Sequence, residues 1–312
     1  MVDTQVRPDV SAIRTSLTQI KPTRGMKIFN VVNVTLLSLF AIAILIPFIN
    51  LVAVSFSDTG AIRAGLVTLL PIANGQVGIN TATFQSVFAD RWFWINYWNT
   101  LRYTVTYVAL AMAITTTFAY AISRPNLKGK SFFIGLAVFT MFFGGGIVPN
   151  FLLITRVLGW RDQMWAIVVP GALSVFNLLV MKSFFENFPS ELIEAGQLDG
   201  ASHYGIFFRI VLPLSKAVLA TMTLFYAVGM WNSWFGAMVY LDSREMFPIM
   251  LYLRNLIVGS TVVENIASDD AANIGRNVGA VAMLLTTIPI MCFYPFVQKY
   301  FVSGVMLGSV KG

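Results

Sequence analysis

Long apolar runs separated by short polar segments dominate the pattern of this chain. A helix that crosses the hydrocarbon core of a bilayer needs about 20 predominantly apolar residues. Six runs approach or exceed that length, and we expect each to form a spanning helix. They cover residues 30–55, 99–122, 132–154, 164–185, 215–240 and 277–298. The pattern therefore predicts an all-α, polytopic membrane protein.

Glycine and proline interrupt several of these runs. The third run contains the triple glycine Gly144 to Gly146, and the fourth contains Pro170 and Gly171. Such breaks are tolerated where neighbouring helices or a cavity satisfy the freed backbone groups. The triple glycine is a candidate hinge, and helix packing through small residues is the more ordinary explanation.

The composition supports a membrane protein with several spans. The chain is 57% hydrophobic and 11% charged, whereas a soluble domain carries about 25% charged residues. The formal net charge of +7 does not indicate a nucleic-acid partner, because the basic residues are scattered and mostly flank the apolar runs. Basic residues in that position anchor spans at the inner leaflet of the lipid bilayer.

The flanking charges predict that both termini lie in the cytoplasm. The loop from Arg124 to Lys130 has three basic residues and no acidic one, whereas segment 241–276 has five acidic residues. We expect a cytoplasmic tail over 1–29, a permease domain over 30–301 and a second tail over 302–312. Segments 56–97 and 241–276 would be long outer loops, and the second would be extended and able to touch a soluble partner.

The sequence offers no recognisable catalytic or metal site. It has one cysteine and one histidine, which excludes clusters of these ligands. Gly129-Lys130-Ser131 resembles the end of a phosphate-binding loop, but Arg124 stands where that loop needs a glycine. The six runs contain no Asp or Glu, which argues against a carboxylate relay for protons or sodium. A secondary transporter or channel remains an alternative, and a membrane-embedded enzyme lacks any catalytic grouping.

A polar insert over 186–214 separates the fourth and fifth runs. We expect a short helix that begins at Ser190, with the hydroxyl capping free N–H groups, and that ends at Gly200 in a left-handed turn. A second short helix should stop at Leu212 and Pro213. The two apolar faces, Leu192, Ala195 and Leu198 on the first helix and Ile206, Phe207 and Ile210 on the second, need a cover. That cover is either a separate protein or the bundle itself.

The insert resembles the EAA loop of ABC importer permeases. The matching residues are Glu194, Ala195, Asp199, Gly200 and Ala201, followed by Phe207, Ile210, Leu212 and Pro213. Gly196 stands where the family usually has a second alanine. Arg124, Trp231-Asn232 and the ending over 298–312 also resemble the second permease subunit of carbohydrate importers, the maltose-permease type. The stretch from Phe143 to Pro149 is similar to a branch for acidic sugar oligomers, including alginate and aldouronate.

This resemblance implies a type I ABC importer permease fold in the bacterial inner membrane. The chain would pair with a second permease, expected to be a different protein. Two ATPase subunits would bind ATP and Mg, so this chain would need no cofactor of its own. A periplasmic or extracellular sugar-binding protein would deliver the sugar. The loop 186–214 would be the coupling loop that links ATP use to alternating access of the cavity.

A polar sugar can cross a membrane only where a lined cavity replaces its hydration shell. The candidate lining residues are polar or aromatic and lie at membrane depth: Asn177, Trp231, Asn232, Ser233 and Trp234. Their alternative role is packing against lipid or a partner subunit. The EAA loop is shared among importers, so an ABC permease for a non-sugar solute also remains open.

Overall fold

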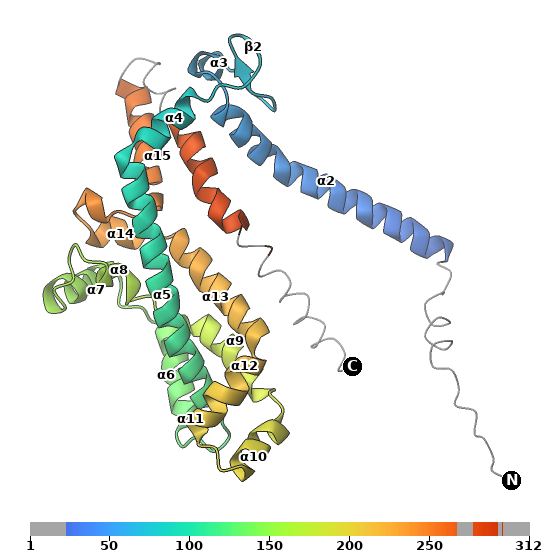
Figure 1. The fold of residues 1–312 in the computed structure, drawn as a ribbon, viewed down its shortest axis with the longest axis vertical. Helices are drawn as coiled ribbons and strands as arrows, with labels where there is room; N and C mark the ends of the chain where they lie inside the picture. The colour runs from blue at the N-terminus through green and yellow to red at the C-terminus, as the bar shows by residue number, and fades with distance from the viewer. Residues whose placement is uncertain (1–22, 267–276, 293–294, 296–312) are drawn as a thin grey trace. The chain divides into compact units, whose positions relative to one another are not determined.

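The computed structural model describes residues 23–266, 277–292 and 295. The chain forms two units, Met1–Leu51 and Val52–Gly312. Most of helix α2 (Arg24–Ser55) belongs to the first unit and is a single helix of 32 residues with Pro47 inside it (Figure 1). Its side chains are exposed from Arg24 through Ile49. A long helix that is apolar on all sides is typical of a membrane span.

Helix α5 (Arg91–Ser123) organises the second unit. It begins after Asp90, whose carboxylate accepts the backbone N–H of Trp92 at 2.8 Å. Its 33 residues make it about 50 Å long, which exceeds the ~30 Å hydrocarbon core of a bilayer. Helices α9 (Val175–Glu186), α13 (Lys216–Trp231) and α15 (Ile249–Ile266) pack along it, and α6 (Lys130–Phe142) packs on α9 (Figure 1).

Tyr226 joins three of these helices. Its hydroxyl forms a 2.6 Å hydrogen bond with the Thr115 hydroxyl on α5, and it accepts the backbone N–H of Ser174 at 3.2 Å, just before α9. A buried hydroxyl pair of this kind satisfies groups that would otherwise be unpaired in an apolar environment. The contact therefore sets how α5, α9 and α13 lie against one another.

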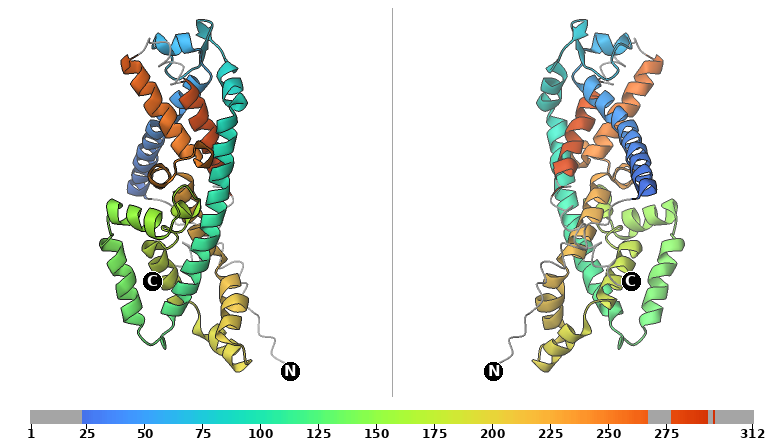
Figure 2. Two further views of the ribbon diagram at one scale, coloured as in Figure 1. Left: turned by 90° about the vertical axis from the view of Figure 1, so that its left-hand side faces the viewer. Right: turned by 90° about the vertical axis from the view of Figure 1, so that its right-hand side faces the viewer.

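Three of the predicted spans are broken. The third divides into α6, α7 (Ile147–Leu152) and η1 (Leu153–Val157), with a bend of 108° (Figure 2). The break falls at the triple glycine, and Gly146 has φ +82° there. The fourth contains α8 (Trp165–Val168) and α9 with Pro170 between them, and the fifth divides into α13 and α14 (Phe235–Tyr240). Proline and glycine break the helical hydrogen-bond ladder at the first two breaks.

Two described helices, α2 and α5, are long and apolar enough to cross a membrane as single helices. Two bent pairs, Lys130–Phe142 with Ile147–Val157 and His203–Leu214 with Lys216–Trp231, raise that number to four if each pair is one span. Ile249–Gly259 and Asn277–Cys292 are shorter apolar helices. The last residues of the sixth predicted span, apart from residue 295, lie outside the described residues.

The outer segments contain more structure than the sequence indicates. Residues 56–97 hold α3 (Thr59–Arg63), a hairpin of β1 (Ile72–Ala73) and β2 (Gln76–Val77), and α4 (Ala82–Ala89). Ile72 pairs with Val77 across the antiparallel hairpin. The prediction of an extended loop over 241–276 was wrong for its described part, which contains η3 (Arg244–Met246) and α15.

Burial explains the helix that was expected to be a loop. Ile249, Tyr252 and Leu253 pack in one cluster with Phe93 of α5 and Val281 of the helix Asn277–Cys292. Hydrogen bonds with α5 also fix residues 245–249, which lead into α15. The amide of Asn99 donates to the Glu245 carbonyl at 2.5 Å, the Tyr103 hydroxyl donates to the Met246 carbonyl at 2.9 Å, and Thr100 Oγ1 accepts the Ile249 N–H at 2.7 Å.

Asp162 joins two segments that are about 80 residues apart in the sequence. Its carboxylate accepts the backbone N–H groups of Asp242 at 3.0 Å and Ser243 at 2.9 Å, and it also accepts the Ser243 hydroxyl. The neighbouring Arg161 pairs with Asp242 at 2.6 Å. Asp162 has φ +56°, a left-handed conformation that Asp adopts more readily than most residues.

We expect acid to open the contact between Asp162 and residues 242–243. Asp162 lies between the third and fourth predicted spans. Its pKa is lowered, chiefly because its carboxylate accepts a hydrogen bond from the Ser243 hydroxyl. A lowered carboxyl pKa stabilises the fold above the unfolded pKa of about 4, and this stability is lost as pH falls through the folded pKa. Hydrogen exchange at the Ser243 amide, relative to its intrinsic rate, should therefore accelerate below about pH 4. Asp162→Asn keeps the turn and removes the charge, so an equally strong acid response in that variant would contradict the prediction.

Candidate functional site

The polar insert forms two short helices at one end of the bundle. The first, α10 (Ser190–Leu198), starts after Pro189 and has no side-chain cap. The predicted cap by Ser190 was wrong, because Ser190 is the first helical residue and the capping position belongs to Pro189. Gly200 follows α10 with φ +77°, which confirms the predicted left-handed turn. Its place in the chain matches the glycine preference at helix C-termini.

The second helical segment packs on the bundle. It runs through α11 (His203–Ile206), η2 (Phe207–Val211) and α12 (Leu212–Leu214), and its first turn is capped by Ser202 Oγ, which accepts the Gly205 N–H at 3.2 Å. Ile206 and Phe207 are buried in one cluster with Tyr120 of α5 and Phe185 of α9. The bundle itself thus covers this apolar face.

The apolar stripe of α10, by contrast, is exposed and is not covered by the bundle. Leu192 is 41% exposed and Leu198 is 90% exposed. Ala195 is exposed as well, and Gly196 is the buried residue of α10. A Cβ atom at Gly196 would lie 2.8 Å from Ile210 Cδ1 and 3.2 Å from Ile206 Cγ1. The missing side chain therefore lets α10 lie against the second segment and turns the leucines outward.

The other residues that resemble the EAA loop fall into two groups, one exposed and one packed against the bundle. Glu194, Asp199 and Ala201 are exposed, as is Pro213. Phe207 is buried, and Leu212 is half-buried against the same cluster. Glu194 and Asp199 lie on or just after α10, beside the uncovered stripe, and the buried members attach the insert to α5 and α9. The structure therefore joins a free surface to the bundle through one short helical segment.

Charged contacts tie the adjoining ends of α5, α6 and α9. Arg124 Nη2 donates to the Phe185 carbonyl at 2.8 Å, and its guanidinium lies 4.6 Å from the Tyr120 ring. Glu186 pairs with Lys130 and with Lys182, each at 2.7 Å. The hydrogen bond from Lys130 has the largest effect, and together with the one from Lys182 it lowers the pKa of Glu186. Sequence reasoning missed Glu186, although its spacing of four from Lys182 is a signal for a helical ion pair.

A cavity of about 430 Å³ lies farther along the bundle between α5, α13 and the helix Asn277–Cys292. Trp231 lines it together with Thr104 and Thr223, which sequence reasoning missed. Trp231 is buried, and its indole N–H donates to the Thr286 carbonyl at 3.2 Å. The Thr104 hydroxyl is buried and has no hydrogen-bond partner among the residues that the structure describes, so it is available to a polar group that enters.

The other four predicted path residues do not line this cavity. Asn177 is buried on α9. Asn232 and Ser233 follow the end of α13, and the Asn232 amide donates to the Val228 carbonyl at 2.8 Å. The guanidinium of Arg254 lies 4.8 Å from the Trp234 ring, so one face of that indole is occupied by a cation. Of the five predicted path residues, Trp231 is therefore the one that lines this cavity.

Residues 130–306 match the family model described as the inner membrane component of binding-protein-dependent transport systems. This chain belongs to that family. It is 34% identical to the polygalacturonan/rhamnogalacturonan transport system permease protein YtcP of Bacillus subtilis (strain 168), over 92% of this chain and 99% of the relative. It is 32% identical to protein LplC of the same organism, over 93% of this chain and 97% of the relative.

A solved structure gives the same result. A chain in the crystal structure of a bacterial ABC transporter involved in the import of the acidic polysaccharide alginate is 34% identical, with a TM-score of 0.78, over 89% of this chain and 98% of that chain. Family membership confirms a bacterial inner membrane protein that is the permease subunit of an ABC importer. In this family the subunit has no ATPase site of its own.

Proposed function

We propose that this permease subunit imports a sugar oligomer by alternating access, driven by ATP hydrolysis on separate subunits. Relatives that are named as transport permeases for polygalacturonan/rhamnogalacturonan and arabinooligosaccharides support a carbohydrate substrate. The related importer of an acidic polysaccharide supports an acidic oligomer within that class. Trp231 and Thr104 are the described residues that we propose for the path. Asn177, Asn232, Ser233 and Trp234 remain candidates for a path that is completed by the partner.

The observation that carries this proposal is the uncovered stripe on α10. Leu198 is 90% exposed on a short helix at the end of the bundle, and an exposed leucine beside Leu192 and Ala195 indicates a surface for a protein partner. We propose that α10 is the coupling helix and that the stripe seats it on an ATPase subunit. Ile206 and Phe207 would pass the resulting motion to α5 and α9, on which they pack.

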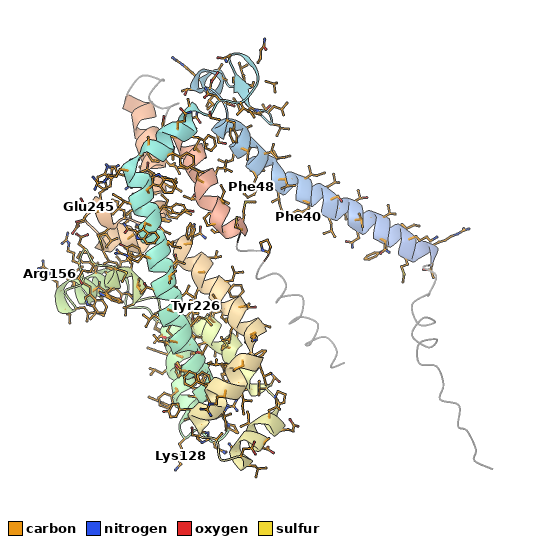
Figure 3. The ribbon with its side chains drawn as sticks, viewed as in Figure 1. Phe40, Phe48, Lys128, Arg156, Tyr226 and Glu245 are labelled. Carbon is orange, nitrogen blue, oxygen red and sulfur yellow. The ribbon has the colours of Figure 1, made fainter. Side chains whose placement is uncertain are left out.

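We further propose six spans with both termini in the cytoplasm, in the type I importer fold. The spans would be α2, α5, α6 with the following bent segment, α9, α13 and the helix that starts at Asn277. The loop 124–130 and the insert 186–214 would then face the cytoplasm, and Lys128 lies at the same end of the bundle as α10 and α11 (Figure 3). The proposed tails 1–29 and 302–312 fall mostly outside the described residues.

The assembly that we propose has four kinds of component. This chain pairs with a second, different permease; two ATPase subunits bind ATP and Mg; and a periplasmic or extracellular sugar-binding protein delivers the substrate. The side chains of α2 are exposed from Arg24 to Ile49 in the described part of its unit, so in the membrane this helix meets lipid or the second permease.

Reconstituted uptake tests this function. The purified complex with its cognate permease, ATPases and binding protein should accumulate acidic oligosaccharides in vesicles when ATP is supplied on the ATPase side. A proton ionophore should leave the rate unchanged, because the six apolar runs contain no carboxylate for a proton relay. Maltodextrin of the same length is the neutral control, and an amino acid is the non-sugar control. Uptake that follows the proton gradient, or uptake of the amino acid alone, would contradict the proposal.

A further inference from the structure

A second cavity lies beside the insert and is separate from the stripe of α10. Its volume is about 520 Å³, and it is formed by the end of α5, the loop that follows α5, and the segment α11–η2. Its polar lining includes Arg124, Asn126 and His203, and its aromatic lining includes Tyr204 and Phe208. The coupling surface proposed above does not use these side chains.

Arg124 is held in place and retains free donors. Its Nε and Nη2 atoms donate to Ser123 Oγ at 3.1 and 2.9 Å, and Nη2 also donates to the Phe185 carbonyl. Nη1 makes no hydrogen bond within the described part of the chain. The guanidinium is always charged, and its geometry suits phosphate oxygens. The cavity therefore presents a fixed cation with an unused pair of N–H groups.

The surrounding charges favour an anion in this cavity. Neither Asp nor Glu is among the described residues that line it, and Lys128 is exposed in the adjoining loop. Of the acidic residues of this region, Glu186 is paired with Lys130 and Lys182, and Glu191, Glu194 and Asp199 lie on or just after α10. The cationic cavity and the acidic helix are therefore separate surfaces.

The aromatic side chains indicate the depth of the cavity relative to the bilayer. Tyr204 is 79% exposed and Phe208 is 59% exposed, and exposed aromatic residues of membrane proteins concentrate at the level of the lipid headgroups. Beyond them, α5 continues as an apolar span with Thr117 and Ala121 at the cavity wall. This order of cation, aromatic ring and apolar wall matches a phospholipid, with a charged headgroup above an acyl chain.

We propose that this cavity binds the headgroup phosphate of an anionic phospholipid of the inner leaflet, with Arg124 as the phosphate ligand. The proposal rests on the cytoplasmic orientation of this end of the bundle. Basic pockets between spans on the cytoplasmic side are a known form of lipid recognition. The bound lipid would lie against α11–η2, the segment that connects α10 to the bundle.

Native mass spectrometry of the full complex, titrated with phosphatidylglycerol or phosphatidylcholine, tests the proposal. We expect selective retention of phosphatidylglycerol. Arg124→Gln should weaken it at least tenfold, since a hydrogen bond to a charged group is lost. Lys128→Gln, which removes an exposed charge in the same loop, should weaken it by no more than about fivefold. Tyr204→Ser should also reduce retention of phosphatidylglycerol. Because the Tyr204 side chain is mostly exposed, this variant should fold even if Arg124→Gln does not.

Other outcomes would overturn the proposal. Equal losses in Arg124→Gln and Lys128→Gln would show diffuse attraction and no site. Retention that is unchanged in both Arg124→Gln and Tyr204→Ser would place the lipid elsewhere. Displacement of the lipid by millimolar inorganic phosphate alone would identify a soluble phosphate ligand, and retention only after removal of the ATPases would show that a protein occupies the cavity. These measurements need neither ATP nor sugar, so they can fail while uptake succeeds, and the reverse also holds.

Discussion

Leu198→Asp will abolish ATP-driven uptake while the permease still folds and reaches the membrane. The side chain is 90% exposed, so the substitution removes no buried contact from the chain itself. On the proposed ATPase surface, a central apolar residue contributes about 2 kcal/mol or more, which corresponds to roughly a 30-fold loss of affinity. A carboxylate placed in the same contact must also be desolvated without a partner. We expect the two effects together to leave less than about a tenth of the wild-type uptake rate.

Gln197→Asp is the matched control for this prediction. It introduces the same side chain one residue earlier, at an exposed position that points about 100° away around the helix. Uptake in vesicles and co-purification of the ATPase should both fall in Leu198→Asp and stay within about twofold in Gln197→Asp. Wild-type uptake and wild-type ATPase retention in Leu198→Asp would remove α10 as the coupling surface.

Gly196→Leu will also abolish uptake, for a different reason. Gly196 is where α10 lies against the second helical segment, and a Cβ there already comes within 2.8 Å of Ile210 Cδ1 and 3.2 Å of Ile206 Cγ1. A leucine adds three further carbon atoms to a space that is filled, and overpacking of this kind costs about 1–3 kcal/mol. Because Ile206 is fully buried in the bundle, we expect α10 to move away and to lose its connection to α5 and α9.

Gly196→Ala is the control, and it should transport within about threefold of wild type. Its nearest clash is with the end of the Ile210 side chain, which can rotate, and alanine stabilises a helix by up to about 1 kcal/mol relative to glycine. Hydrogen exchange over α10 should rise in Gly196→Leu with an unchanged amount of protein in the membrane. Normal uptake by Gly196→Leu would show that the contact between α10 and the second segment does not transmit the motion.

Several features of the insert could be predicted because their causes are local. The left-handed turn at Gly200, just after the end of α10, follows from the ease with which glycine takes φ +77°. The two short helices follow from apolar spacing that lies within a few turns. The direction of the stripe could not be predicted, because an apolar stripe does not say which partner covers it. The contact of Gly196 with Ile206 and Ile210 decided that point.

Outside the insert, the incorrect or missed predictions have a similar cause. The mixed charges of 241–276 favoured a loop, yet Ile249 and Tyr252 are buried against Phe93 and Val281, far away in the sequence. The same holds for Asp162, whose partners are Asp242 and Ser243. Neither pairing leaves a signal within one helix turn, so neither could be found by reading short windows of the chain.

The sequence by itself determined that this protein is a helical membrane protein with a polar insert, and the resemblance of its motifs to ABC importer permeases predicted its family. Apolar length and short motifs are sufficient for those conclusions, since each acts over one span or one turn. The tertiary structure alone decided where the spans bend, which face of α10 remains free and which side chains share a cavity. Those features depend on contacts between distant segments, and burial in such contacts overrides local preference.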